Sequence, residues 1–408
     1  MKKLLYVGHA YHKKTKSVGF LQELFESRYE VHYFADDPQS PARFEELAKL
    51  PVKEFDLLVV FQIMPSIKEI KQFVSFKQGI FFPMYDYYFG CTPLSNPIWN
   101  EYKDFMIINF AEAAHKDMVK AGFMSRYIQY FPKPAEKYEE GQTDGLYFWQ
   151  RLTRLNVYTV YNLFNKFPLK NLHIHKVLDP SENFTPIPAE ENNFCKWYFD
   201  GMNVTESTWY DTREEMKQDI ERYALYMAPR THEGIGMSFL EAMAMGRCVI
   251  SPDIPTMNEY ITNGKTGLLY DWEAQKPLEL TPEKIREIQK NTYEYIKEGY
   301  ARWDAHKSII FEWMESASRV KEERNAMKER FPRIFRKLCP NALFDRLQAL
   351  YDELSGKLLC WTTTSCRLFG IIPVVKIKRV DTRRMKLYIF GIPVFESITA
   401  DNRTPWED

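Results

Sequence analysis

Residues 227–271 read MAPRTHEGIGMSFLEAMAMGRCVISPDIPTMNEYITNGKTGLLYD and place a turn, a helix, a buried strand and a second loop in one short segment. Glu233 precedes a Gly-x-Gly turn at 234–236, and the chain is predicted to be helical from Ser238. Gly246 follows the helix, where a residue in the left-handed conformation commonly ends one. The apolar run that comes next is typical of a strand buried in a parallel sheet.

This order of elements predicts a binding site for an anion that also carries hydroxyl groups. Glycines allow a tight turn and a close approach of the backbone to a ligand. A helix N-terminus presents unpaired N–H groups and the positive end of the helix dipole, so phosphate is its natural occupant. Glu233 and Glu241 flank this site, and carboxylates there accept hydrogen bonds from the hydroxyls of a ribose or a sugar. Phosphate together with hydroxyls indicates a nucleotide sugar.

The segment resembles the retaining GT-B glycosyltransferases of the family 4 type, the glycosyl transferases group 1. The resemblance runs from EGIGMSFLEAMAMGRCVIS to Asn258-Glu259 and NGKTGLL in order and spacing. It implies that Glu241 binds the donor ribose and that Glu233 is a catalytic residue near the transferred sugar. It also implies that the turn and the helix start bind the donor. The residues of this segment are Gly234, Ile235, Gly236, Met237 and Ser238.

A structural alternative explains part of the same pattern. Ser238-x-x-Glu241 is also a capping box, in which the serine caps the helix and the glutamate reaches back to the same turn. This alternative accounts for Glu241, but it explains neither Glu233 nor the loop downstream.

Composition narrows the functional classes. The 408-residue chain carries 55 Lys and Arg against 55 Asp and Glu, so its net charge is zero and nothing favours a nucleic-acid partner. Six cysteines without a Cys-x-x-Cys pair predict a reduced, cytosolic chain. We expect neither a signal peptide nor a membrane helix, because no apolar run reaches the roughly 18–20 residues that a span needs.

Short apolar strands alternate with helical segments on both sides of a linker, which predicts an α/β protein with parallel sheets. The resemblance implies the GT-B architecture of two Rossmann-like domains facing across a cleft, with a helical and β-rich C-terminal appendage. We assign 1–135 to an acceptor domain and 145–280 to a nucleotide-sugar domain. Residues 281–339 are expected to be helical, either crossing back to the first domain or forming a surface pair or dimer seam. Residues 340–408 form a basic and apolar tail.

Two residues of the first domain are candidates for the reacting centre. His9 follows the first predicted strand and Asp86 follows the strand at 80–82, at the end of a parallel sheet where ligands bind. In the related family the matching loops face the acceptor, and a His or Asp often lies near the reaction. A surface histidine and a turn-capping aspartate are the alternatives.

Two arginines are candidates for the diphosphate. In the family, the first strand of the second domain leads to Gly-Arg, and a Lys follows five residues later. Here Arg151 keeps the Arg position, Gln150 replaces the Gly, and Asn156 stands where the Lys is expected. Arg154 is close enough to replace the missing cation, since a guanidinium can bind two phosphate oxygens at once. The alternative is that these are solvated loop arginines.

His173 and His175 alternate along a predicted strand, but nothing nearby completes a metal site, and we expect no metal and no cofactor. The tail repeats an FGI-type motif at 368–374 and 389–394 around a basic patch. This pattern predicts contact of 367–395 with an anionic membrane surface. A β-hairpin with its lysines in water is the alternative.

We expect a hexosyltransferase that moves a sugar with retention from a nucleotide-diphosphate sugar, UDP being favoured over GDP. The acceptor is expected to be a hydroxyl of a glycan or a lipid-linked sugar in bacterial surface polysaccharide or lipopolysaccharide synthesis. The enzyme would be cytoplasmic, with peripheral contact on the inner membrane face. The alternatives are an inactive sugar-nucleotide-binding protein and a membrane-associated scaffold.

Overall fold

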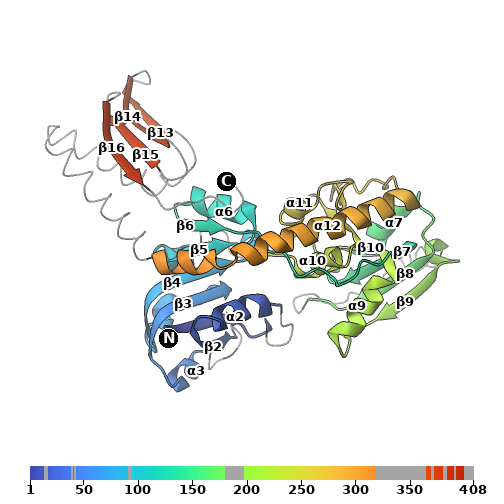
Figure 1. Ribbon diagram of the computed structural model, residues 1–408, viewed down its shortest axis with the longest axis horizontal. Helices are drawn as coiled ribbons and strands as arrows, with labels where there is room; N and C mark the ends of the chain where they lie inside the picture. The colour runs from blue at the N-terminus through green and yellow to red at the C-terminus, as the bar shows by residue number, and fades with distance from the viewer. Residues whose placement is uncertain are drawn as a thin grey trace. The chain divides into compact units, whose positions relative to one another are not determined.

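The computed structural model describes residues 1–12, 17–37, 40, 43–90, 94, 96–179 and 197–317, and four strands within 364–398 (Figure 1). It divides into two compact units. The first comprises Met1–Gln129 with the described residues from His306 onward, and the second comprises Tyr130–Ala305. Each unit is built around a parallel six-stranded sheet with helices packed against it.

The first unit has the strand order β2-β1-β3-β4-β5-β6, and every neighbouring pair is parallel. Several of its strands contain buried apolar runs, as expected for strands covered on both faces. They are β1 Lys3–His9, β2 Glu30–Asp36, β3 Glu54–Gln62, β4 Ser75–Pro83, β5 Met106–Asn109 and β6 Met124–Tyr127. The helices are α2 Gly19–Glu26, α3 Glu45–Lys49, α4 Ile67–Ile70, α5 Tyr85–Gly90, the 3-10 helix η1 Pro97–Tyr102, and α6 Glu112–Lys120.

A late helical segment at 309–317 packs on this first unit. The side-chain amide of Gln78 donates to the carbonyl of Met314 at 3.1 Å. Arg28 donates through Nη2 to Glu315 Oε1 at 2.8 Å, and the guanidinium also lies over the Phe311 ring. Buried apolar side chains of the segment complete the contact, so the segment belongs structurally to the first unit.

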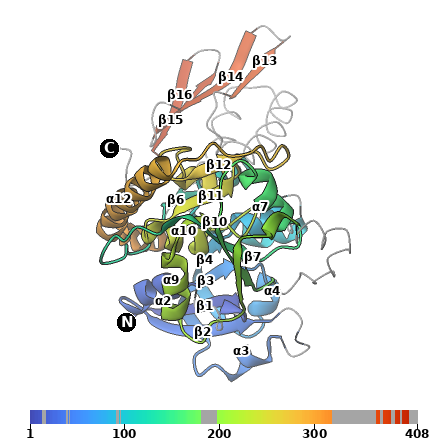
Figure 2. The same ribbon diagram turned by 90° about the vertical axis from the view of Figure 1, so that its right-hand side faces the viewer.

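The second unit has the strand order β12-β11-β10-β7-β8-β9, again all parallel. Figure 2 shows β10, β11 and α10 close together in this unit. The strands are β7 Gln142–Gln150, β8 Asn171–Lys176, β9 Asn203–Ser207, β10 Tyr223–Met227, β11 Cys248–Pro252 and β12 Leu268–Tyr270. The helices are α7 Val157–Phe164, α9 Arg213–Glu221, α10 Met237–Ala244, α11 Met257–Tyr260 and α12 Pro282–His306. The loops after β10, β7 and β8 therefore leave the sheet at one edge, beside each other.

The sequence also predicts a helix over 67–76, a last strand of the first sheet at 127–130 and an irregular segment over 181–209, and the structure differs at all three. The helix expected at 67–76 is one turn, Ile67–Ile70, because the aromatic segment after it enters β4. The last strand of the first sheet is Met124–Tyr127 rather than 127–130, since its buried polar residues disguise it. Asn109 Nδ2, for example, donates to Ser125 Oγ at 2.8 Å. The segment 181–209, expected to be irregular, contains the exposed edge strand β9, whose sequence lacks an apolar face.

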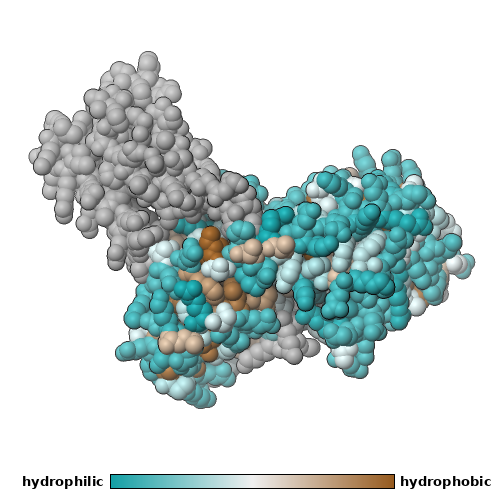
Figure 3. Space-filling view, in the orientation of Figure 1, coloured by the Kyte–Doolittle hydropathy of each residue, from teal (hydrophilic) through white to brown (hydrophobic). Residues whose placement is uncertain are grey.

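The tail contains an antiparallel four-stranded sheet in the order β13-β14-β15-β16. Its strands are Thr364–Leu368, Ile372–Arg379, Arg384–Ile389 and Ile392–Ile398. β14 and β15 pair as neighbours, so the basic segment lies on adjacent antiparallel strands. In the part of the chain that the structure describes, no helix has the length and apolar character needed to cross a membrane. The face in Figure 3 is mainly hydrophilic over both units, with some hydrophobic residues over the first.

Candidate functional site

The start of α10 is shaped by Gly236. This residue is the N-cap, with φ +85° and ψ 44° in the left-handed region that favours glycine. A Cβ there would overlap the Phe239 ring, so the close packing of that ring also requires a glycine. The helix begins at Met237, one residue before the predicted Ser238, and its first amides have no acceptor within the helix. Gly246 follows the helix with φ +73°. This is the left-handed conformation predicted for the residue that ends the helix.

The capping-box alternative for Ser238 and Glu241 is wrong. The N-cap is Gly236, which has no side chain, and no side-chain cap bond is present at α10. The carboxylate of Glu241 instead accepts a hydrogen bond from Arg213 Nη2. A capping box does occur nearby, at the start of α9, where Thr212 and Glu215 satisfy each other's backbone groups. Glu241 therefore has no role in capping α10.

Glu241 lies in a largely buried position next to a cation. Its side chain is 18% exposed, whereas that of Arg213, the first residue of α9, is 55% exposed. Burial raises the pKa of Glu241 above its ordinary value, and the positive charge of Arg213 opposes that rise. The carboxylate is thus held by a partner that solvent can reach.

Glu233 is buried immediately before the Gly-x-Gly turn. The Tyr226 hydroxyl lies near the carboxylates of both Glu233 and Glu241. Burial, together with these two negative charges, raises the pKa of Tyr226, so its hydroxyl stays protonated. The strand β10 and the turn after it thus bring the two glutamates predicted from sequence into one neighbourhood.

Arginines from two loops meet at one carboxylate on the same edge of the sheet. Arg151, directly after β7, donates from Nε to Asp179 Oδ1. Arg230, in the loop after β10, donates from Nε and Nη2 to Asp179 Oδ2 at 2.9 and 2.5 Å. Asp179 follows β8, is 5% exposed, and also donates its backbone N–H to the Arg151 carbonyl at 3.1 Å. A single buried carboxylate therefore orients two guanidinium groups.

Arg154 adds a third cation to this cluster. Its Nη2 donates to Thr231 Oγ1 at 2.6 Å, and among the described residues it pairs with no carboxylate. Asn156, at the position of the family lysine, accepts from the Tyr158 N–H at 2.9 Å and caps α7. The site thus combines a helix N-terminus, two glutamates and three arginines. Sequence reasoning missed Arg230 and Asp179, which bond to each other although they lie 51 residues apart in the chain.

His9 and Asp86 lie at the carboxyl edge of the first sheet, as their positions after strands predict. His9 ends β1, and its Nδ1 accepts from the Tyr11 N–H at 2.9 Å. Asp86 is partly buried in the first turn of α5, directly after β4. β3 separates their strands and ends at Gln62, which has an unusual positive φ of 66°. Both residues therefore lie at the same edge of the first sheet.

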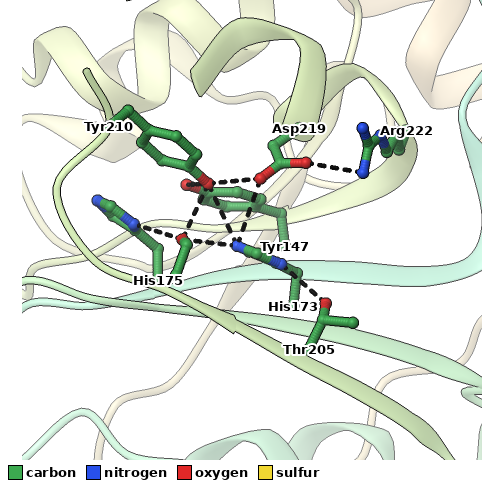
Figure 4. Close-up of polar contacts among 8 residues, drawn as sticks. Tyr147, His173, His175, Thr205, Tyr210, Asp219 and Arg222 are labelled. Atoms are coloured by element: carbon green, nitrogen blue, oxygen red, sulfur yellow. Dashed lines mark hydrogen bonds and ion pairs between the residues drawn. The ribbon is translucent and has the colours of Figure 1, made fainter. Parts of the chain in front are cut away.

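His173 and His175 form a hydrogen-bonded network rather than an open pair (Figure 4). His173 contacts Thr205 Oγ1 through Nδ1 at 2.9 Å and Ser207 Oγ through Nε2 at 2.8 Å. His175 Nδ1 also contacts Ser207 Oγ at 2.8 Å. Tyr210, which stacks on His175, then donates to Asp219 Oδ2 at 2.8 Å. Both histidines therefore hydrogen-bond to side chains of the same unit.

Comparisons with known proteins give a family match over part of the chain and a shared fold. Residues 191–282 match the family described as glycosyl transferases group 1. Sucrose-phosphate synthase from Thermosynechococcus elongatus shares the fold with a TM-score of 0.56 at 14% identity, covering 78% of this chain and 100% of that one. HepE from Anabaena, in complex with UDP and glucose, gives 0.53 at 13% identity, covering 74% and 96%.

The lipopolysaccharide outer core galactosyltransferase WaaB in its apo form gives 0.52 at 13% identity, covering 78% and 99%. At these identities the three structures establish the fold alone, which is GT-B. No curated protein sequence is significantly similar to this chain. The family segment and the fold together support a GT-B glycosyltransferase.

Proposed function

We propose that the protein transfers a sugar, with retention of anomeric configuration, from a nucleotide-diphosphate sugar to a hydroxyl group. The observation that carries the proposal is the start of α10, where Gly236 turns the backbone toward a site flanked by Glu241 and the Asp179 arginine cluster. The donor would lie in the second unit. UDP is favoured over GDP as its nucleotide, and HepE, which has this fold, was solved with UDP and glucose.

The charges at this edge suit a diphosphate. Arg151, Arg154 and Arg230 carry three positive charges against the one negative charge of Asp179, and the α10 dipole adds to them. Guanidinium groups in this arrangement are suited to the negative charge of a nucleoside diphosphate. Because guanidinium groups would balance the developing charge, we propose that no metal ion is required.

The proposed transfer step needs no protein side chain to accept the proton of the acceptor hydroxyl. The acceptor hydroxyl oxygen bonds to the anomeric carbon while the bond from that carbon to the β-phosphate oxygen breaks. The bonding pair leaves with the diphosphate, whose oxygens also take the acceptor proton. Glu233, buried before the turn, would stabilise positive charge that develops on the sugar. His9 and Asp86 are proposed to orient the acceptor from the first unit.

The acceptor is proposed to be a glycan or a lipid-linked sugar in bacterial surface polysaccharide synthesis. WaaB, a lipopolysaccharide outer core galactosyltransferase, has the same fold. We further propose that 367–395 contacts the inner face of the cytoplasmic membrane. The basic side chains that motivate this contact lie outside the residues whose side chains the structure describes. Neutralising Lys376, Lys378, Arg379, Arg383, Arg384 and Lys386 with glutamine should abolish flotation with anionic vesicles, and unchanged flotation would contradict the contact.

A screen of UDP- and GDP-sugars tests the proposed activity. We expect one donor to release its nucleoside diphosphate, faster when a glycan acceptor is present, and at an unchanged rate when EDTA is added. The product's anomeric signals in NMR should show the configuration of the donor. Inverted product would overturn retention, and loss of turnover in EDTA that Mg²⁺ restores would overturn metal independence.

An inactive sugar-nucleotide-binding protein remains the second candidate. Two departures from the family pattern favour it, Gln150 for the glycine and Asn156 for the lysine. Calorimetric binding of a nucleotide sugar without release, with every acceptor tried, would support this alternative over the transferase.

A further inference from the structure

The family lysine is absent from its usual place, and the residue found there cannot replace it. Asn156 is neutral, and its side chain is committed to the start of α7. Its Oδ1 accepts from the Tyr158 N–H at 2.9 Å, and its Nδ2 donates to the Thr153 carbonyl at 3.3 Å. A diphosphate site built on Arg151 alone would be short of positive charge.

A different residue supplies a cation at the same edge of the sheet. Arg230 is three residues before Glu233, on the loop that leads from β10 to α10. Its guanidinium meets Asp179 at 2.9 and 2.5 Å, on the oxygen that Arg151 does not use. Since β10 and β8 both neighbour β7, the three loops converge, and Asp179 holds both guanidinium groups from one side.

The geometry of the shared carboxylate leaves donors for a ligand. Arg151 binds Asp179 through Nε, so its two terminal nitrogens are not used in that contact. The side chains of Arg151 and Arg230 are 23% and 25% exposed, whereas Asp179 is 5% exposed. The carboxylate is therefore more deeply buried than the two guanidinium groups, which solvent can partly reach. Such an arrangement binds a planar or tetrahedral anion with two or more oxygens.

We propose that Arg230 is the second diphosphate-binding cation of this protein, in place of the family lysine, and that Asp179 is the residue that positions Arg230 and Arg151 as one clamp. The inference rests on the proposed function, because it assigns these residues to the donor diphosphate. Arg154, bonded to the neutral hydroxyl of Thr231, completes the cationic surface.

Binding of UDP and GDP, compared with uridine and guanosine, tests the clamp. Arg230→Ala should weaken binding of the preferred diphosphate about tenfold to a hundredfold, the range for hydrogen bonds between charged groups. Binding of the phosphate-free nucleoside should stay within about twofold, which a merely structural role would not predict. Arg230→Lys keeps the charge and should recover part of the diphosphate affinity. Arg286→Ala, on the exposed face of α12, is the control and should bind as the wild type does.

Asp179→Asn separates positioning from simple charge. If Asp179 positions the arginines, the variant loses diphosphate affinity although a negative charge has been removed. A gain in affinity would overturn the positioning role. Equal losses for diphosphate and nucleoside in Arg230→Ala, or no loss, would overturn the role of Arg230. If Arg230→Ala does not fold, the diphosphate affinities of Arg230→Gln and Arg230→Lys are compared instead. Gln lacks the charge that Lys keeps, so the clamp predicts weaker binding for Arg230→Gln.

Failure of the proposed function gives a different result. A wild-type protein that binds neither UDP nor GDP overturns that function and the clamp together. Wild-type binding with an unaffected Arg230→Ala variant overturns the clamp alone.

Discussion

Gly236 holds the backbone in a conformation that few other residues tolerate, and the start of α10 depends on it. Its φ is +85°, and a Cβ would overlap the Phe239 ring. The left-handed conformation and the overlap together should cost about 2–4 kcal/mol of stability in Gly236→Ala. The amides at the helix start would also be displaced. We therefore expect a lower thermal midpoint and weaker UDP binding.

Gly201→Ala is the matched control for this prediction. Gly201 has nearly the same φ, +84°, but nothing lies within 4 Å of a Cβ built on it. This variant should lose only the backbone part, about 1–2 kcal/mol, and should bind UDP as the wild type does. Equal effects of the two substitutions on UDP binding would contradict the assigned role of Gly236.

The Arg213–Glu241 pair predicts a pH dependence of donor binding. Burial raises the pKa of Glu241, and Arg213 is the largest influence that lowers it. Removing Arg213 should therefore raise that pKa further. As the pH falls, Glu241 then becomes protonated at a higher pH than in the wild type. The acid limb of UDP-sugar affinity should move to higher pH in Arg213→Ala, while affinity above the limb is retained. Superimposable pH profiles for wild type and variant would show that Glu241 does not bind the donor.

At the scale of elements, strand positions could be predicted well because buried parallel strands are continuous apolar runs. β1, β3 and β10 stand out in sequence for that reason. β9 is an exposed edge strand and β6 carries buried polar groups, so neither has that pattern. Local composition reveals a strand only where burial is uniform.

The candidate site could be predicted only in part, for a related reason. Glu233, Glu241 and the glycines lie within one short segment, so their spacing is visible in the sequence. Arg230 and Asp179 form an ion pair only because the fold brings their loops together at the sheet edge. Nothing in the sequence around either residue indicates this pair. The partner of Glu241 was likewise hidden, because Arg213 comes from a different helix.

The histidine network between β8, β9 and α9 predicts how stability changes with pH. Burial lowers the pKa of His175 to about 4, and His173 adds to this, while Asp219 opposes it. The pKa of His173 is also lowered by burial. From pH 6.5 down to about 4 the unfolded chain therefore binds protons that the native state does not. The free energy of unfolding should fall with pH across this window, by about 3 kcal/mol for His175 alone.

His175→Gln measures this contribution. The variant should lose less stability than the wild type between pH 7 and pH 4.5 in urea unfolding, since it has no proton to gain at this position. Parallel curves for wild type and His175→Gln would indicate that His175 is already protonated in the folded state.

At the scale of the whole molecule, the chain divides its predicted tasks between two sheets of the same construction. The second unit carries the helix start, the glutamates and the arginines, whereas His9 and Asp86 lie on the first. The late segment at 309–317 returns to the first unit through Gln78 and Arg28. The residues proposed to bind the donor therefore lie on the second unit, and those proposed to orient the acceptor lie on the first.

The central claim is tested most directly by measuring the release of nucleoside diphosphate from UDP- and GDP-sugars. Three proteins are compared, the wild type, Glu241→Ala and Glu214→Ala. Glu214 is an exposed glutamate of the neighbouring helix α9 and serves as the matched control. We predict release from one donor by the wild type and by Glu214→Ala, and a fall of about tenfold to a hundredfold in Glu241→Ala. Undiminished release by Glu241→Ala, or no binding of any nucleotide sugar by the wild type, would contradict the assignment of the α10 start as the donor site.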